Sequence, residues 1–199
     1  GQISKDWDTI KNELETRGIS SVAPDLFDLA KGRKLDYPTV YQAFSELCES
    51  YQDKLNLCGL SLGGLLALNY AIQYPKKINS LVLIGTPFEI PKGLLKFQNI
   101  VFRFMPKAVF QNMGVSKKDF IRLSKSMVDL NFMDSATALD CPALILCGAK
   151  DKTNMESAKR FHEAMKNSKL VIVEASGHEV NKDNPNELVR VLQDFWADR

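Results

Sequence analysis

A serine in the first third of the chain lies in a short segment whose glycine spacing suits a nucleophile. Residues 59–63 read Gly-Leu-Ser-Leu-Gly and match the pattern G-x-S-x-G, with Ser61 at the centre. An apolar run precedes this segment and a helix-like stretch follows it, so the serine falls on a sharp strand-to-helix turn. Such a turn projects the hydroxyl outward and leaves N–H groups at the helix start unpaired. We therefore expect Ser61 to be a nucleophile and the Leu62 N–H to bind a developing oxyanion.

A serine hydroxyl is a poor nucleophile at neutral pH unless a base takes its proton, and histidine suits that role best. The chain has two histidines. His162 lies in a helical pattern among charged residues, and we expect it to face solvent. His178 follows an apolar run in a Ser-Gly-His loop, which places it at a sheet end within reach of Ser61. We predict that His178 is the base.

A third group should fix the imidazole tautomer and stabilise the imidazolium, and this requires a carboxylate in the loop after another strand. Asp151 occupies such a loop, in the segment Cys-Gly-Ala-Lys-Asp at 147–151. The chain order Ser, Asp, His is also the order expected for a serine on a strand-to-helix turn. Glu89 and Asp140 are alternatives, and Glu89 is the stronger one because it follows a strand ending at Ile84. The prediction is Asp151.

The elements that must position these residues are apolar strands that alternate with helices. Helical spacing is present over 5–17, 39–50 and 62–74, and short apolar runs predict strands at 19–22, 55–58, 80–84, 143–147 and 170–174. Strands that are nearly continuous in apolar residues indicate a mostly parallel sheet covered by helices on both faces. The fold class is therefore α/β. In such sheets functional residues lie beyond the carboxyl ends of strands, where the serine, acid and histidine all fall.

Residues 88–140 break this alternation, because they carry helical patterns without an intervening strand. We interpret them as a helical lid or cap insertion in one domain whose core comprises 1–87 and 141–199. Core packing and the lining of an apolar substrate pocket explain the apolar residues of this insertion about equally well. The segment favours an apolar acyl or aromatic substrate. The apolar residues are Phe97, Phe102, Phe104, Met105, Phe110 and Met113.

Composition excludes several other classes of protein. The chain has 26 basic and 24 acidic residues, so no uniform field exists to hold nucleic acid or an anionic membrane. No apolar run approaches the roughly 20 residues that span a bilayer, and the amino terminus lacks a signal-peptide pattern. The four widely spaced cysteines suit reduced, buried thiols, and we expect a cytoplasmic protein. They are Cys48, Cys58, Cys141 and Cys147.

These features together resemble the α/β-hydrolase superfamily, in its small lid-bearing esterase branch, over nearly the whole sequence. The resemblance implies a serine hydrolase that cleaves a carboxylic ester or related acyl substrate through an acyl-enzyme, without metal or cofactor. A thioesterase, an acyltransferase, a lyase and a carbon–carbon bond hydrolase are alternatives within the superfamily. A ligand-binding member without turnover is the alternative from another class. The matching features are Trp7, Ala23-Pro24-Asp25, Gly59 to Gly64, Gly148 to Asp151, and Ser176-Gly177-His178.

Two departures from the superfamily pattern concern the start of the chain. Residues 26–29 read Leu-Phe-Asp-Leu where a Gly-His-Gly or Gly-Tyr-Gly run is usual. The strand that usually ends in His-Gly is also absent before Trp7. We therefore expect the first strands, and the second oxyanion donor, to lie upstream of Gly1 in a longer protein of about 220–260 residues.

Overall fold

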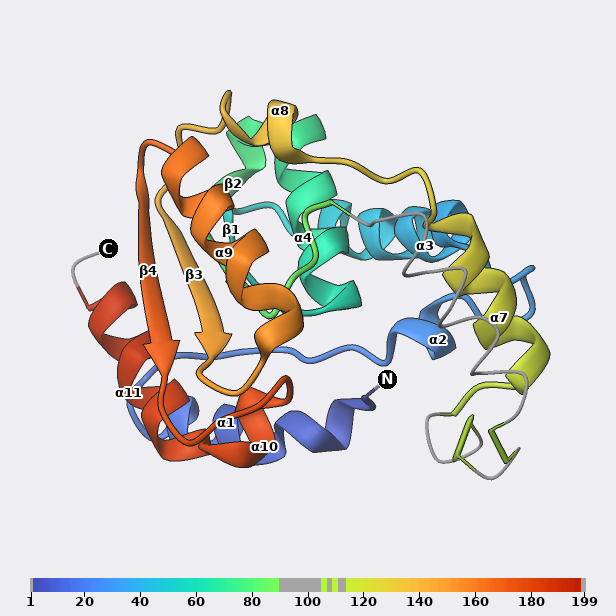
Figure 1. The fold of residues 1–199 in the computed structure, drawn as a ribbon, viewed down its shortest axis with the longest axis horizontal. Coiled ribbons are helices and arrows are strands. Elements are labelled where there is room, and N and C mark those ends of the chain that lie inside the picture. The colour runs from blue at the N-terminus through green and yellow to red at the C-terminus, as the bar shows by residue number, and fades with distance from the viewer. Residues whose placement is uncertain (1, 90–104, 107–108, 111–113, 198–199) are drawn as a thin grey trace.

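A computed structural model describes residues 2–89, 105–106, 109–110 and 114–197 (Figure 1). Within them the chain forms a four-stranded sheet in the order β1-β2-β3-β4, and every neighbouring pair is parallel. Because all the strands run the same way, their carboxyl ends meet at one edge of the sheet. The strands are β1 (Leu55–Leu60), β2 (Ile78–Ile84), β3 (Ala143–Gly148) and β4 (Ser168–Val173).

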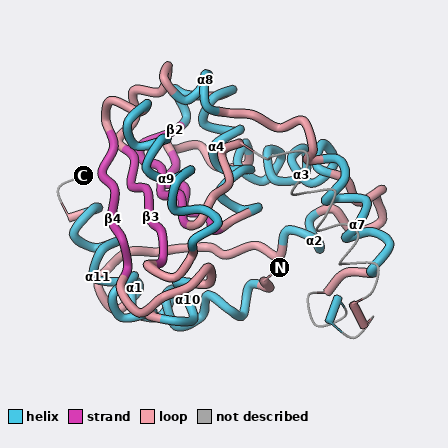
Figure 2. Tube along the Cα trace, in the orientation of Figure 1, coloured by secondary structure: helices cyan, strands magenta, loops and turns pink. Residues whose placement is uncertain are grey.

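Helices cover both faces of this sheet, and the strands lie between them (Figure 2). Side chains alternate along β2, so Leu81 and Leu83 join one buried cluster while Val82 and Ile84 join the other. The first cluster contains α3 (Tyr37–Glu49), α4 (Leu62–Gln73) and α9 (Lys152–Ala164). The second contains α1 (Asp8–Glu15), α10 (Val180–Asp183) and α11 (Pro185–Trp196).

Local sequence signals set the starts of several helices. Asp36 caps α3 by accepting a hydrogen bond from the Thr39 N–H, and Pro38 occupies the first turn. Asn184 caps α11 in the same way. Asp151 caps α9 and accepts from the Asn154 N–H, so the predicted acid also begins a helix. The shorter helical turns are η1 (Ser4–Trp7), α2 (Leu26–Leu29) and η2 (Pro75–Lys77).

The predicted strand at 19–22 is wrong, whereas the other four predicted strands are confirmed. Residues 19–25 are not part of a helix or strand, and no described strand pairs with them. Val22 is 68% exposed. A β-branched run favours extended backbone, but a strand also needs a neighbouring strand to bond with, and this run has none in the described part of the chain.

The predicted insertion at 88–140 is described only in part. It contains α7 (Lys117–Ser126) and α8 (Met133–Ala136), and an isolated bridge joins Glu89 to Asn131. Of its apolar residues, Met105 and Phe110 are described, and Phe110 is buried. Phe97, Phe102, Phe104 and Met113 lie outside the described residues. The division into core and lid stays a prediction. None of the helices in the described ranges is both long and apolar enough to cross a membrane.

Candidate active site

Backbone hydrogen bonds continue past the strand ends and hold the loops that carry the predicted residues. The loop after each of the first three strands is bonded to the next strand or to the residues that follow it. Each loop is therefore fixed relative to its neighbour, which places Ser61, Asp151 and His178 at one edge of the sheet. The bonds are Ser61 N to Ile84 O at 2.9 Å, Gly85 N to Leu146 O at 2.8 Å, Ala149 N to Val173 O at 2.9 Å, and Lys150 N to Ser176 O at 2.8 Å.

Ser61 has a backbone conformation that L residues rarely adopt. It lies between β1 and α4 with φ 55° and ψ −114°. Such a conformation costs on the order of 1–3 kcal/mol and persists only where the surrounding structure imposes it. Leu62 is the first residue of α4, so its N–H has no acceptor within the helix. The sharp turn expected from the sequence is therefore present.

Two glycines allow the close packing around this turn. A methyl group on Gly59 would overlap the backbone of Gly63 and Gly64, and one on Gly64 would overlap the Thr86 hydroxyl. A methyl group on Gly63 would meet nothing within 4 Å. The close approach of strand and helix therefore depends on the first glycine of the motif and on Gly64, and the second motif glycine is not required for it.

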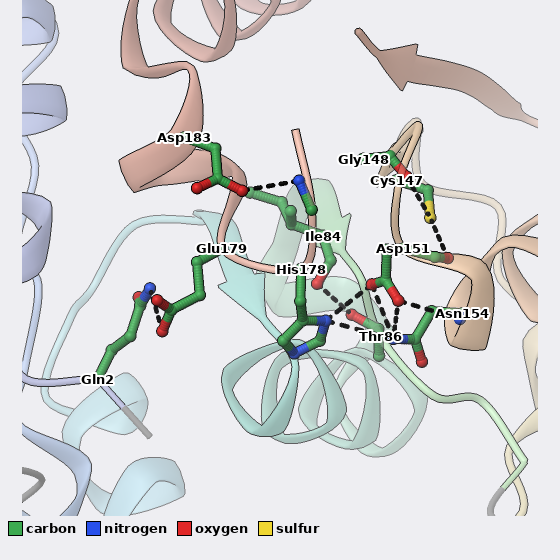
Figure 3. Close-up of polar contacts among 11 residues, drawn as sticks. Gln2, Ile84, Thr86, Cys147, Gly148, Asp151, Asn154, His178, Glu179 and Asp183 are labelled. Atoms are coloured by element: carbon green, nitrogen blue, oxygen red, sulfur yellow. Dashed lines mark hydrogen bonds and ion pairs between the residues drawn. The ribbon is translucent and has the colours of Figure 1, made fainter. Parts of the chain in front are cut away.

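His178 and Asp151 are joined directly, as the sequence predicts. The imidazole Nδ1 lies 2.8 Å from Asp151 Oδ2 (Figure 3). The Asp151 side chain is 5% exposed, whereas that of His178 is 41% exposed. An ionised carboxylate can only accept, so this bond assigns the proton of a neutral imidazole to Nδ1. The Nε2 lone pair is then free to accept a proton from another group.

Asn154, in the first turn of α9, completes the surroundings of the acid. Its Nδ2 lies 3.0 Å from Asp151 Oδ1 and 2.8 Å from Oδ2, and it is 3.3 Å from His178 Nδ1 (Figure 3). Its backbone N–H also donates to Asp151 Oδ1. Burial alone would raise the pKa of the Asp151 carboxyl, but hydrogen bonds from His178 and Asn154 more than offset it and lower that pKa. The acid is thus ionised at neutral pH.

Gly85, directly after β2, lies against this pair. Its φ is +50°, and a methyl group there would lie 3.0 Å from His178 Nδ1 and 3.2 Å from Asp151 Oδ2. Because the Ser61 N–H bonds to the carbonyl of Ile84, the serine and the imidazole flank the same short segment. No hydrogen bond joins Ser61 to His178 among the described residues. Such bonds are often long before substrate binds.

The alternative acids make other contacts. Glu89 forms an ion pair with Arg160 at 3.4 Å. Asp140 precedes β3, at the opposite end of that strand from Asp151, and its carbonyl accepts from Asn167. Neither bonds to His178. The described residues contain no group of three or more His, Cys, Asp or Glu that could hold a metal ion.

The expectation that His162 faces solvent is wrong. Its ring is half-buried, and Nδ1 lies 2.8 Å from Ser168 Oγ, which in turn donates to Met165 O. This histidine therefore links the end of α9 to the start of β4. Charged sequence neighbours suggested exposure, but the packing of α9 on β4 decides which face of the helix is covered.

Two residues of the site were not identified from the sequence. The position of Asn154, three residues after a helix-capping aspartate, was a usable signal for a contact with Asp151. Gly85 follows a strand end and has positive φ, but nothing in its sequence neighbourhood predicts that it touches the imidazole. The contact of each residue with His178 depends on how separate strand ends meet.

A parallel sheet between helices, with a strained serine turn and a His–Asp pair at its carboxyl edge, defines an α/β-hydrolase fold. Residues 7–131 match the family described as alpha/beta hydrolase fold, so the chain belongs to this family. Membership indicates a hydrolase enzyme.

The similar proteins have low sequence identity to this chain. A 2-hydroxy-6-oxo-2,4-heptadienoate hydrolase of Pseudomonas putida is 25% identical over an aligned length of 181 residues. The alignment covers 73% of this chain and 64% of that protein. This chain thus spans less than two thirds of that relative. A thermophilic esterase from Thermogutta terrifontis has a TM-score of 0.77 at 17% identity, covering 98% and 86% of the two chains. MenH from S. aureus has a TM-score of 0.71 at 17% identity, covering 98% and 90%. These structural likenesses show the fold alone.

Proposed function

We propose that this chain is a serine hydrolase that cleaves a carboxylic ester or a related acyl compound, with Ser61, His178 and Asp151 as the catalytic residues. The observation that carries this proposal is the 2.8 Å bond from His178 to the buried Asp151, formed at the sheet edge where Ser61 adopts its strained turn. The esterase and the hydrolase among the similar proteins are consistent with it.

The proposed reaction has two steps. Ser61 Oγ attacks the acyl carbon while His178 Nε2 takes the hydroxyl proton, and the Leu62 N–H stabilises the oxygen that becomes negative. The imidazolium returns the proton to the departing alcohol, which leaves an acyl group on Ser61. Water then attacks this acyl-enzyme by the same route, and His178 again accepts and returns a proton. Asp151 holds the imidazole and stabilises its positive form throughout.

The substrate class is also part of the proposal. We favour a small-molecule acyl substrate that is apolar, because the region 88–140 is rich in apolar and aromatic side chains. The alternative activities would use the same three catalytic residues and would differ in the substrate. They are thioester cleavage, acyl transfer, a lyase reaction and hydrolysis of a carbon–carbon bond. A screen of acyl esters and thioesters of graded chain length would separate ester from thioester cleavage and show which acyl length fits.

Intact mass after incubation with a fluorophosphonate tests the proposal. An activated Ser61 attacks phosphorus, fluoride leaves, and the protein gains the mass of the phosphonyl group. We expect one label on the unsubstituted protein and none on Ser61→Ala or His178→Ala. An unlabelled protein that still binds an acyl ligand would favour the non-catalytic ligand-binding alternative.

A further inference from the structure

The amide of Asn154 is placed to control the geometry of the proposed catalytic pair. Asn154 is 7% exposed, and its Nδ2 reaches both oxygens of Asp151, at 3.0 and 2.8 Å. In the described part of the chain, the side chains that bond to this carboxylate are His178 and Asn154. The buried Asp151 carboxylate therefore accepts hydrogen bonds from two side chains, the neutral amide of Asn154 and the imidazole of His178.

A carboxylate held by one bond can still rotate about its Cβ–Cγ bond. With His178 alone, rotation would carry Oδ2 away from Nδ1 and would leave the imidazole free to turn. The Asn154 amide, spanning both oxygens, opposes that rotation. The backbone N–H of Asn154 bonds to Oδ1 at 3.3 Å and strengthens the same orientation. Oδ2 therefore faces the imidazole before any substrate binds.

The Asn154 amide also lies close to the imidazole of His178, but it does not form a hydrogen bond with it. Nδ2 is 3.3 Å from His178 Nδ1, but Nδ1 cannot accept from the amide while it donates to Asp151. The shorter distances to the carboxylate oxygens show where the amide protons point. Asn154 and the imidazole are thus two donors to one acceptor, packed side by side, which keeps the imidazole proton on Nδ1.

We propose that Asn154 is a positioning residue that holds the Asp151 carboxylate in the plane required by His178, so that His178 Nε2 is available to take the Ser61 proton. This inference rests on the proposed function. A helix-capping role alone does not account for the arrangement, because the cap uses the backbone N–H of Asn154, which every substitution except proline retains.

The test compares Asn154→Ala and Asn154→Leu with the unsubstituted protein. Both variants lose the amide, and they differ in volume, so a shared effect traces to the amide rather than to a cavity. Asn69→Ala is the control, because Asn69 is also a helical asparagine, half-buried where Asn154 is buried, and its Nδ2 donates to Tyr37 OH rather than to the site. Thermal unfolding of each protein establishes that it is folded at the assay temperature.

Two measurements test the inference. The first is fluorophosphonate labelling at Ser61, resolved into a maximal rate and a half-saturating concentration. We expect the maximal rate to fall about 10- to 100-fold in both Asn154 variants, the scale of a hydrogen bond to a charged group, with the half-saturating concentration unchanged. The control should react like the unsubstituted protein. The second readout is the downfield proton NMR signal of the Asp151-bound Nδ1–H, which we expect to broaden or disappear in both Asn154 variants.

The outcomes separate this inference from the proposed function. If the unsubstituted protein is labelled and both Asn154 variants react at its rate, the inference is overturned and the proposed function stands. If the unsubstituted protein is not labelled, the proposed function fails, and the proton signal then tests only whether Asn154 holds Asp151 against His178. Its survival in both variants overturns the inference, and its loss supports it. With two histidines in the chain, comparison with His162→Gln assigns the signal.

Discussion

Replacement of Gly85 by alanine tests whether the imidazole of His178 has the position described above. Gly85 has φ +50°, and an added methyl group would lie 3.0 Å from His178 Nδ1 and 3.2 Å from Cε1. Ordinary van der Waals contact begins near 3.4 Å, so the ring must move by about 0.4 Å. The bond to Asp151, now 2.8 Å long, must lengthen or tilt as it does so.

Two effects of this substitution have different sizes and different readouts. Positive φ costs an alanine about 1–2 kcal/mol, and the reduced freedom of the unfolded chain offsets about 0.4–1 kcal/mol of that. The net loss of about 1 kcal/mol corresponds to a fall in Tm of about 2–4 °C for a chain of this size. Displacement of the base by several tenths of an ångström should slow the reaction of Ser61 by about 10-fold.

Gly32→Ala separates the two effects. Gly32 has φ +78°, and a methyl group there would meet nothing within 4 Å. It therefore carries the same backbone cost without touching the site. We expect the two variants to lose similar thermal stability, measured by circular dichroism. Only Gly85→Ala should react slowly with the fluorophosphonate, followed by intact mass at a temperature where both are folded. Equal labelling of the two variants would refute the reasoning, because the base would then tolerate a displacement that the structure requires.

Three further predictions concern the acid, the core and the thiols. Asp151→Asn should slow labelling by up to about 10⁴-fold, since the amide can favour the wrong imidazole tautomer; labelling within 10-fold of the unsubstituted protein would contradict this role. Because the pKa of Asp151 is lowered by folding, its ionised form stabilises the protein above about pH 3.9, and this contribution is lost as the pH falls through the lower folded-state pKa. The difference in unfolding free energy between the two proteins, from urea titrations at pH 6 and pH 3, should therefore shrink at the lower pH. Ile145→Ala should reduce the unfolding free energy by about 2–5 kcal/mol, because Ile145 is fully buried in the central part of the sheet; a loss below 1 kcal/mol in urea unfolding would argue against that packing. Burial raises the pKa of Cys48 to about 12 and that of Cys147 to about 11, so both buried thiols should resist iodoacetamide at pH 8 until the chain unfolds, and rapid alkylation of the folded protein would show that they are exposed.

Local patterns were sufficient for much of the fold. The apolar runs that became β1 to β4 were recognisable because a strand buried on both faces needs apolar side chains at nearly every position. The run at 19–22 has the same local character and forms no strand. Its sequence specifies extended backbone, but pairing depends on a neighbour that lies elsewhere in the chain. Only the tertiary structure decides whether such a run becomes part of a sheet.

Residue types and their order along the chain, without tertiary information, led to Ser61, Asp151 and His178. A reactive serine needs a strained turn and a base. The spacing of the glycines around Ser61 indicated the turn, and the small number of histidines limited the choice of base. The sequence favoured Asp151 over Glu89 but could not show which acid contacts His178. The structure joins Asp151 to His178 and pairs Glu89 with Arg160, because β4 lies beside β3 at the edge of the sheet.

The positions of Asn154 and Gly85 relative to His178 depend on the tertiary structure. Asn154 Nδ2 lies 3.3 Å from His178 Nδ1 across 24 positions of sequence, and Gly85, 93 positions away, is so close to the imidazole that an added methyl group would press on it. Neither distance along the chain has a periodic signature, because these contacts arise where the ends of separate parallel strands meet. The sequence determined which groups could react and which segments would be buried. The packing of β2, β3 and β4 decided which neutral side chains and which glycine lie against those groups, since only the folded sheet brings the strand ends within a few ångströms of one another.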